Sequence, residues 1–97
     1  MKVFILNYLS DCSESGSVPY EMPVLITKTE EEAWEEIKQE FELWCEQHGY
    51  KVDDIPEDEE GNMSFTELFF HKTAKSFTLC DFGDFHIWNI HEMEFNI

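Results

Sequence analysis

Residues 29–49 read TEEEAWEEIKQEFELWCEQHG, and this stretch decides the fold. Thr29 followed by Glu32 is a capping-box pattern, in which the threonine oxygen and the glutamate carboxylate each accept from an unpaired backbone N–H at a helix start. Gly49 stands where a left-handed C-cap is favoured. The sequence therefore predicts a helix over residues 30–47.

The apolar residues of this helix lie on one side. At about 100° per residue an arc of roughly 120° holds Ala33, Trp34, Ile37, Phe41, Trp44, Cys45 and His48. Such a stripe has to be buried, so we expect the helix to pack across a sheet. Leu43 lies opposite the arc, between acidic residues. It either packs beneath residues 50–63 or forms an apolar contact within a charged recognition surface.

Two short segments before the helix have strand patterns. Residues 2–9 (KVFILNYL) are β-branched and aromatic, and the middle of the run is apolar on both faces. This is typical of a central strand, and the polar cluster over residues 10–17 predicts a loop after it. Residues 22–27 (MPVLIT) predict a second strand entered through Pro23, which cannot donate a ladder hydrogen bond and suits a strand start.

After the helix, the acidic residues 50–63 predict a long connection that is mobile in part. Residues 64–75 are ambiguous, and we expect a short helix or turn because apolar residues recur there at helical spacing. Residues 76–95 alternate and break at Gly83-Asp84, a pair that favours a tight hairpin. A two-residue loop would place on one face Phe77, Leu79, Trp88 and Ile90. A three-residue loop would change every pairing, so the register stays open.

These elements predict an α+β fold, an antiparallel sheet of about four strands with one long amphipathic helix packed across one face. The length of 97 residues fits one domain over residues 1–97, and 42% hydrophobic residues are too many for a disordered acidic tail. No secretory signal or spanning segment is evident, so we expect a cytoplasmic protein. The three cysteines, Cys12, Cys45 and Cys80, are widely spaced and are expected to be reduced.

The charge is the strongest indication of function. The chain has 22 Asp and Glu against 6 Lys and Arg, a net charge of −16, and fourteen of the acids lie in residues 30–60, opposed there only by Lys38 and Lys51. Such a field points toward a basic protein partner and would be repelled by nucleic-acid phosphates and by anionic lipids.

The helix acids are only partly explained by folding. Glutamates in the first turn are stabilised by the helix dipole, by about 0.3 to 1 kcal/mol each. The like-charged i,i+4 pairs further along cost about 0.2 to 0.5 kcal/mol apiece, on the order of 1 to 2 kcal/mol together. We therefore expect a partner-binding surface made of Glu31, Glu35, Glu42, Leu43, Glu46, Asp53, Asp54, Glu57, Asp58, Glu59 and Glu60. Acidity that serves only solubility is the alternative.

The residues carry no signature of catalysis or of a cofactor. An EF-hand alignment on Gly61 places Pro56 at the first ligand position, where an aspartate is needed, although loose divalent binding stays open. Cys45 and His48 are close in sequence, but no second pair completes a zinc site, and His86 and His91 point to opposite faces of one strand. No motif activates a cysteine in so negative a field. We expect no enzyme activity, no metal and no cofactor.

The leading hypothesis is a non-enzymatic interaction protein that occupies a basic groove of a DNA- or RNA-binding protein, such as a nuclease or effector, and inhibits it. In size, acidity and lack of catalytic motifs the chain resembles the small phage-borne nucleic-acid mimics, anti-restriction and anti-CRISPR proteins among them, and the resemblance is one of composition. The alternative is a small accessory protein–protein interaction domain that pairs through a sheet edge or the hairpin that bears Trp88. A carboxylate-rich cation binder is the third possibility.

Overall fold

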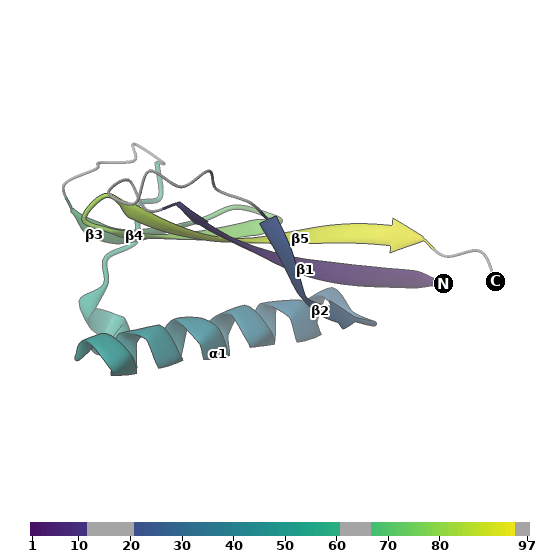
Figure 1. Ribbon diagram of the computed structural model, residues 1–97, viewed down its shortest axis with the longest axis horizontal. Coiled ribbons are helices and arrows are strands. Elements are labelled where there is room, and N and C mark those ends of the chain that lie inside the picture. The colour runs from purple at the N-terminus through teal and green to yellow at the C-terminus, as the bar shows by residue number, and fades with distance from the viewer. Residues whose placement is uncertain (12–20, 61–66, 95–97) are drawn as a thin grey trace.

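The computed structural model describes residues 1–11, 21–60 and 67–94. In this part of the chain an antiparallel sheet carries a long helix against one face (Figure 1). The elements are, in chain order, β1 (Lys2–Asp11), β2 (Glu21–Thr27), α1 (Glu30–His48), the 3₁₀ turn η1 (Val52–Asp54), β3 (Leu68–Lys72), β4 (Ser76–Asp81) and β5 (Asp84–Glu94). The strand order is β2-β1-β5-β4-β3. The α+β class is confirmed, but the sheet has five strands and not about four.

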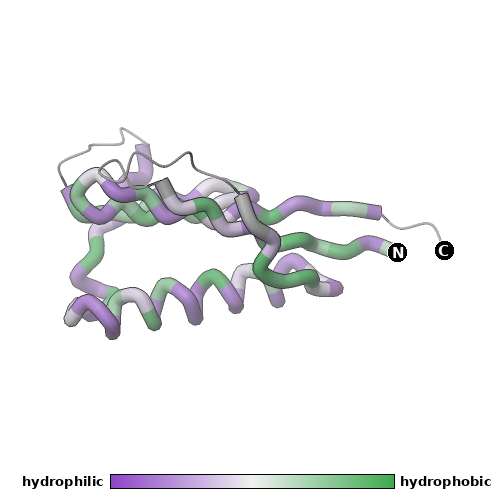
Figure 2. Tube along the Cα trace, viewed as in Figure 1, coloured by the Kyte–Doolittle hydropathy of each residue, from purple (hydrophilic) through white to green (hydrophobic). Residues whose placement is uncertain are grey.

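Helix α1 begins at Glu30, as predicted, and ends at His48, one residue beyond the predicted end and next to the predicted C-cap Gly49. Thr29 is extended, with φ −129° and ψ 154°, and its Oγ1 accepts from the Glu32 N–H at 3.2 Å. At the other end Gly49 has φ 77°, where a Cβ would strain the backbone, and its N–H donates to the carbonyls of Cys45 and Glu46. Hydrophobic and hydrophilic residues recur in turn along the helix (Figure 2). The buried ones belong to the core between the helix and the sheet.

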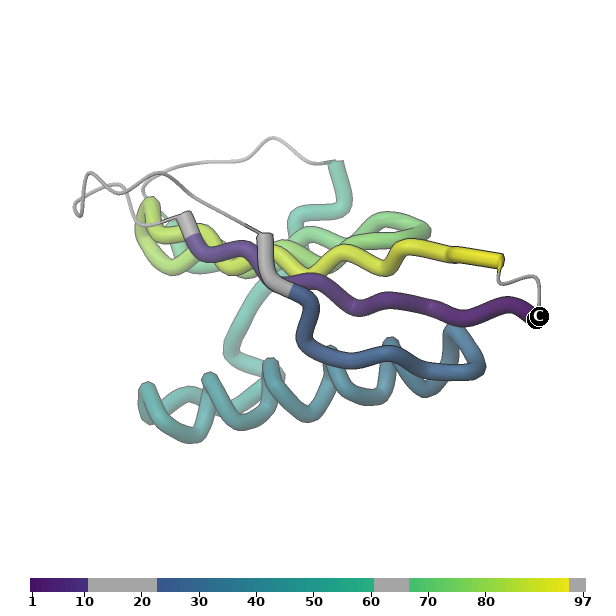
Figure 3. Tube along the Cα trace, turned by 45° about the vertical axis from the view of Figure 1, so that its right-hand side comes forward, coloured from purple at the N-terminus to yellow at the C-terminus, as the bar shows by residue number. Residues whose placement is uncertain are grey.

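Strand β1 is an interior strand, as its apolar pattern predicts. It lies between β2 and β5 and pairs with β5 along its whole length (Figure 3). The strand extends two residues beyond the predicted end, to Asp11. The remainder of the predicted loop, residues 12–17, lies outside the described part of the chain.

Strand β2 forms one edge of the sheet and accommodates a proline. Leu6 of β1 pairs with Leu25, whereas the next residue, Asn7, pairs with Pro23. Val24 is therefore the additional residue of a β-bulge. An edge strand with a bulge tolerates a residue without an N–H, which is the position that the sequence suggested for Pro23.

The expectation of a helix or turn over residues 64–75 is wrong for residues 68–72, which form β3. Phe69 and Phe70 are adjacent, and each is buried or half-buried on a different side of the sheet. Only the two-residue period of a strand sends neighbouring side chains to opposite faces. Residues 61–66, which include Phe65, lie outside the described part of the chain.

The acidic connection contacts both the core and the sheet where the structure describes it. Ile55 is buried in the core beside α1. Beyond it, the Phe70 N–H donates to the Pro56 carbonyl at 3.0 Å, and the Asp58 N–H donates to the Phe70 carbonyl at 2.7 Å. Residues 56–58 therefore run along the outer edge of β3 and pair with its middle.

The hairpin β4–β5 has a two-residue loop, but its centre is Phe82-Gly83 and not Gly83-Asp84. Asp81 pairs with Asp84, and the two loop residues have φ 50° and 102°, both positive as in a type I′ turn. Moving the loop centre by one residue slides the pairing by two, which keeps each side chain on its face. The helix-facing set is accordingly the predicted one, and Phe77 lies opposite Trp88.

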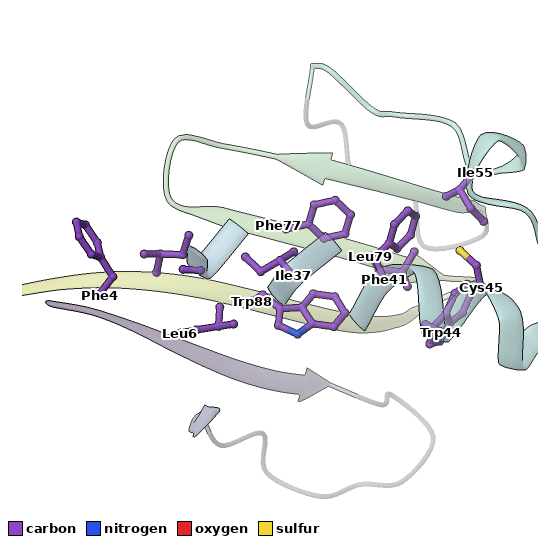
Figure 4. Close-up of a cluster of buried hydrophobic side chains, with 12 residues drawn as sticks. Phe4, Leu6, Ile37, Phe41, Trp44, Cys45, Ile55, Phe77, Leu79 and Trp88 are labelled. Atoms are coloured by element: carbon purple, nitrogen blue, oxygen red, sulfur yellow. The ribbon is translucent and has the colours of Figure 1, made fainter. Parts of the chain in front are cut away.

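The main core lies between α1 and this face of the sheet (Figure 4). Ile37, Phe41, Trp44 and Cys45 project from the helix, and facing them on the strands are Phe4, Leu6, Phe77, Leu79, Trp88 and Ile90. A second, smaller cluster lies on the other face of the sheet and contains Phe69, Cys80 and Phe85, with Ile87 packed against it.

Two substitutions on α1 test this orientation. Ile37 is 2% exposed and Leu43 is 52% exposed. Ile37→Ala should lower the free energy of unfolding in urea by about 2 to 5 kcal/mol, because it leaves a cavity in the core. Leu43→Ala should change it by less than about 0.5 kcal/mol. Equal losses for both variants would mean that the helix is rotated relative to the sheet.

Candidate functional site

The two flanks of α1 border different grooves between the helix and the sheet. On the flank toward β3, Glu31 and Glu35 line the same groove as Glu57. On the opposite flank Leu43 lines a groove with Val24 of β2. The predicted partner-binding residues are therefore divided between two sites.

The β3 groove is the larger, with a volume of about 510 Å³. Its floor is apolar and consists of Trp34, Ile37, Phe41, Phe70 and Phe77, and its rim consists of Glu31, Glu35, Lys38, Glu57 and Lys72. The rings of Phe41, Phe70 and Phe77 pack mutually, with centroid distances of 5.1 to 5.7 Å. The result is an aromatic depression framed by charged side chains.

A cation already lies on one wall of this groove. The Lys72 Nζ is 4.6 Å from the centroid of the Trp34 ring, a cation–π contact. Trp34 is half-buried, and its Nε1 donates to Glu30 Oε1 at 3.4 Å. The same carboxylate oxygen accepts from Lys75 Nζ at 2.9 Å, and this hydrogen bond is the main cause that lowers the pKa of Glu30. Burial opposes the shift, while donation from Trp34 and the charge of Lys75 add to it. The hydrogen bond at Nε1 thus fixes the position of the Trp34 indole.

Acids of the connection lie along the flank of the helix that bears Glu31, Glu35 and Glu42. Glu57 faces Glu31 and Glu35 across the groove. Nearer the C-terminal end, the pKa of the Cys45 thiol is raised first by burial and then by the charges of Asp54 and Glu42, which places both carboxylates near that thiol. Glu46 on the helix and three residues of the connection, Asp53, Glu59 and Glu60, are exposed, while Asp58 is half-buried.

Leu43 does not belong to this flank. Its side chain is 52% exposed and is not covered by residues 50–60. The expectation that Leu43 packs beneath the connection is therefore wrong. It borders the groove on the other side of the helix, where it is surrounded by aromatic residues and by Glu40. The helical wheel predicts that Leu43 lies between glutamates on either side, but it does not show which strand the glutamates on each side face.

Among the described residues, few of the acids are compensated by cations. The ion pairs join Lys2 to Glu92 at 3.6 Å and Lys75 to Glu30 at 2.9 Å. Neither involves a predicted partner-binding residue. In the described ranges, Glu31, Glu35, Glu42 and Glu46 have no ion-pair partner, so their charge is directed to solvent.

The β2 groove, on the opposite flank, has a volume of about 370 Å³. It is lined by Tyr8, Val24, Glu40, Leu43, Trp44, Gln47, His86 and Trp88. Trp88 Nε1 donates to Glu40 Oε2 at 2.5 Å, and the Tyr8 hydroxyl lies 2.6 Å from His86 Nδ1. These contacts join residues 48 and 78 positions apart, so no local sequence pattern revealed them.

Burial perturbs two groups in the β2 groove. It raises the pKa of Glu40, although donation from Trp88 opposes the shift and the charge of Glu36 adds to it. It lowers the pKa of His86, against the opposing charges of Asp81 and Asp84 and with a small further lowering from His48. Glu40 hydrogen-bonds the indole N–H of Trp88, and His86 hydrogen-bonds the hydroxyl of Tyr8.

The cysteines and histidines do not assemble into a metal centre in the described ranges, where no group of three or more His, Cys, Asp and Glu could hold an ion. Cys45 and Cys80 are buried thiols on opposite faces of the sheet. His48 stacks on Trp44, with ring centroids 4.3 Å apart, and its Nδ1 lies 2.9 Å from the Trp44 carbonyl oxygen. Cys12 and the glycine of the EF-hand alignment, Gly61, lie outside the described residues.

The edge formed by β2 is a further exposed feature. Val24, Leu25 and Ile26 are consecutive apolar residues with exposed side chains, and Ile26 is 62% exposed. An apolar edge strand without a charged residue between its exposed side chains is suited to pairing with another strand. The other edge differs, because residues 56–58 pair with the middle of β3.

No helix in residues 1–11, 21–60 and 67–94 is long and apolar enough to cross a membrane. Comparisons of the chain with protein-family models, with curated proteins and with solved structures found no match.

The pH dependence of stability tests the environment of His86. Because burial lowers its pKa in the folded protein, its contribution is complete above the ordinary value of 6.5 and is lost as the pH falls through that value toward the folded pKa. The free energy of unfolding of the wild type minus that of His86→Gln should therefore decrease between about pH 7.5 and about pH 5.5. Glu40, whose raised pKa acts in the opposite direction, is present in both proteins and cancels. A difference that does not vary with pH would place His86 in solvent.

Proposed function

We propose that the protein is a non-enzymatic binding module that occupies a basic, nucleic-acid-binding surface of another protein and inhibits it. The observation that carries the proposal is the uncompensated acidic flank of α1, next to the acidic residues 53–60. In the described part of the chain Glu31, Glu35, Glu42 and Glu46 have no ion-pair partner, and a basic partner would neutralise their charge.

The spacing of the charges supports a nucleic-acid mimic. From Glu31 to Glu46 the helix spans roughly 22 Å, at about 1.5 Å rise per residue. The four helix glutamates and the acids of residues 53–60 lie over this length, while B-DNA presents one charge per about 1.7 Å. The densities are of the same order. The setting that we propose is the cytoplasm of a bacterium, with a nuclease or effector as the partner, in the manner of the anti-restriction and anti-CRISPR inhibitors.

The apolar edge of β2 favours a second candidate, an accessory domain that pairs strand to strand with a partner protein. Val24, Leu25 and Ile26 would supply the contact, and the acidity would serve solubility. The two candidates differ in their dependence on salt, because charge-driven association weakens as the Debye length falls from about 10 Å at 0.1 M to about 3 Å at 1 M.

A charge-reversal variant tests the acidic flank. Changing Glu35, Glu42 and Glu46 together to Lys alters exposed side chains only, so the fold should be retained. The wild type, immobilised, should capture a basic protein from a bacterial lysate at low salt and release it at high salt, and the triple variant should capture none.

The matched control changes Glu67, Glu92 and Glu94 to Lys, which gives the same change in net charge on exposed residues outside the predicted binding surface. The ion pair of Glu92 with Lys2 that this control removes is exposed and contributes little to stability. It should capture the partner as the wild type does. Equal capture by the flank variant would remove α1 from the proposal. Capture that resists salt and is lost in Ile26→Lys would favour the accessory domain.

A further inference from the structure

We propose that the β3 groove is a receptor for an arginine side chain of the basic partner. The inference rests on the proposed function and adds to it a defined contact, in which the guanidinium stacks on Trp34 and pairs with a glutamate of the rim. The acidic flank would then attract the partner, and the groove would fix its position.

The floor of the groove suits a flat, partly apolar group. Trp34 and Phe70 are half-buried and offer ring surface from the helix and from β3, while Phe41 and Phe77, which also line the groove, are buried. The hydrogen bond from the Trp34 Nε1 to Glu30, and the ion pair of Glu30 with Lys75, fix the orientation of the indole before any ligand arrives. Little conformational freedom is therefore lost when a ligand stacks on it.

The rim determines the charge of the ligand. Glu31, Glu35 and Glu57 outnumber the two lysines there, and none of these carboxylates has an ion-pair partner in the described part of the chain. An anionic ligand would be repelled, and a neutral apolar group would make no use of the rim. A guanidinium fits better than an ammonium, because it is planar, weakly hydrated and able to pair with a carboxylate while its face covers an aromatic ring.

Lys72 shows that this wall accepts a cation, because its amine already lies over the Trp34 ring. Its side chain is exposed, and it extends from the edge strand of the sheet. An incoming arginine would displace the Lys72 amine from the ring into solvent. Lys72 is therefore an internal competitor, and its removal should strengthen binding by more than its charge alone explains.

The probe for the experiment is an acetylated and amidated peptide, Gly-Ser-Gly-Arg-Gly-Ser-Gly, with a twin in which citrulline replaces arginine. Citrulline has nearly the same shape and no charge. Binding is followed by NMR at low salt through the indole N–H signals of the three tryptophans. The arginine peptide should shift the Trp34 signal saturably, and the citrulline peptide should bind at least about fivefold more weakly.

Two variants and a matched control locate the site. Trp34→Leu should weaken the arginine peptide by about fivefold or more. Lys72→Gln should strengthen it by about threefold or more, since the competing cation–π contact is removed. Lys51→Gln makes the same change in charge outside the groove and should alter the affinity by less than about twofold. Lys72 and Lys51 are both exposed, so these two variants should fold normally.

Equal affinity for the arginine and citrulline peptides, or equal effects of Lys72→Gln and Lys51→Gln, would overturn the inference. So would a response confined to the indoles of Trp44 and Trp88, which line the other groove. If the peptide fails but a basic partner is still captured through the acidic flank, the groove is not the receptor and the proposed function stands. If the peptide binds as expected and no basic partner is captured, the proposed function fails and the arginine site remains.

Discussion

The packing of the apolar stripe of α1 against the sheet is the contact on which the rest of the structure depends. The buried residues of the main core come from this helix and from the strands that face it, with Ile55 closing one end. Helix dipole and capping contribute on the order of 1 kcal/mol each, whereas each large side chain buried in this contact contributes about 1.5 to 3 kcal/mol. The stripe therefore determines which way the helix faces, and so where its acids are displayed.

With the stripe fixed, the glutamates of α1 can only lie on its outer side and flanks. The connection then brings Ile55 into the core and residues 56–58 to the edge of β3, which places a second group of acids beside the first. Folding tolerates the repulsion because the side chains are solvated and the core contact is larger than the cost. The same geometry leaves an aromatic groove within the acidic flank, where charge and apolar surface are presented together.

The sequence predicted those features that depend on local patterns. The limits of α1 follow from its capping residues. The strands β1 and β2 follow from the types and pattern of their residues, and the helix-facing residues of the hairpin follow from the alternation of side chains along a strand. The segment that forms β3 was wrongly predicted as a helix or turn, because its apolar residues fit the spacing of a helix as well as that of a strand. Only the burial of adjacent residues on opposite faces of the sheet distinguishes the two structures. The position of Leu43, the hydrogen bond of Trp88 to Glu40 and the β3 groove depend on contacts between distant segments, so one helical wheel could not place them.

The central claim is that the acidic flank takes the place of a nucleic acid. Its most direct test is a fluorescence-polarisation assay in which the protein is titrated into a preformed complex of the captured basic partner with labelled DNA or RNA. The account predicts that the labelled nucleic acid is released intact and that the protein and the nucleic acid never occupy the partner together. A stable ternary complex, with the labelled strand retained at saturating protein, would contradict it.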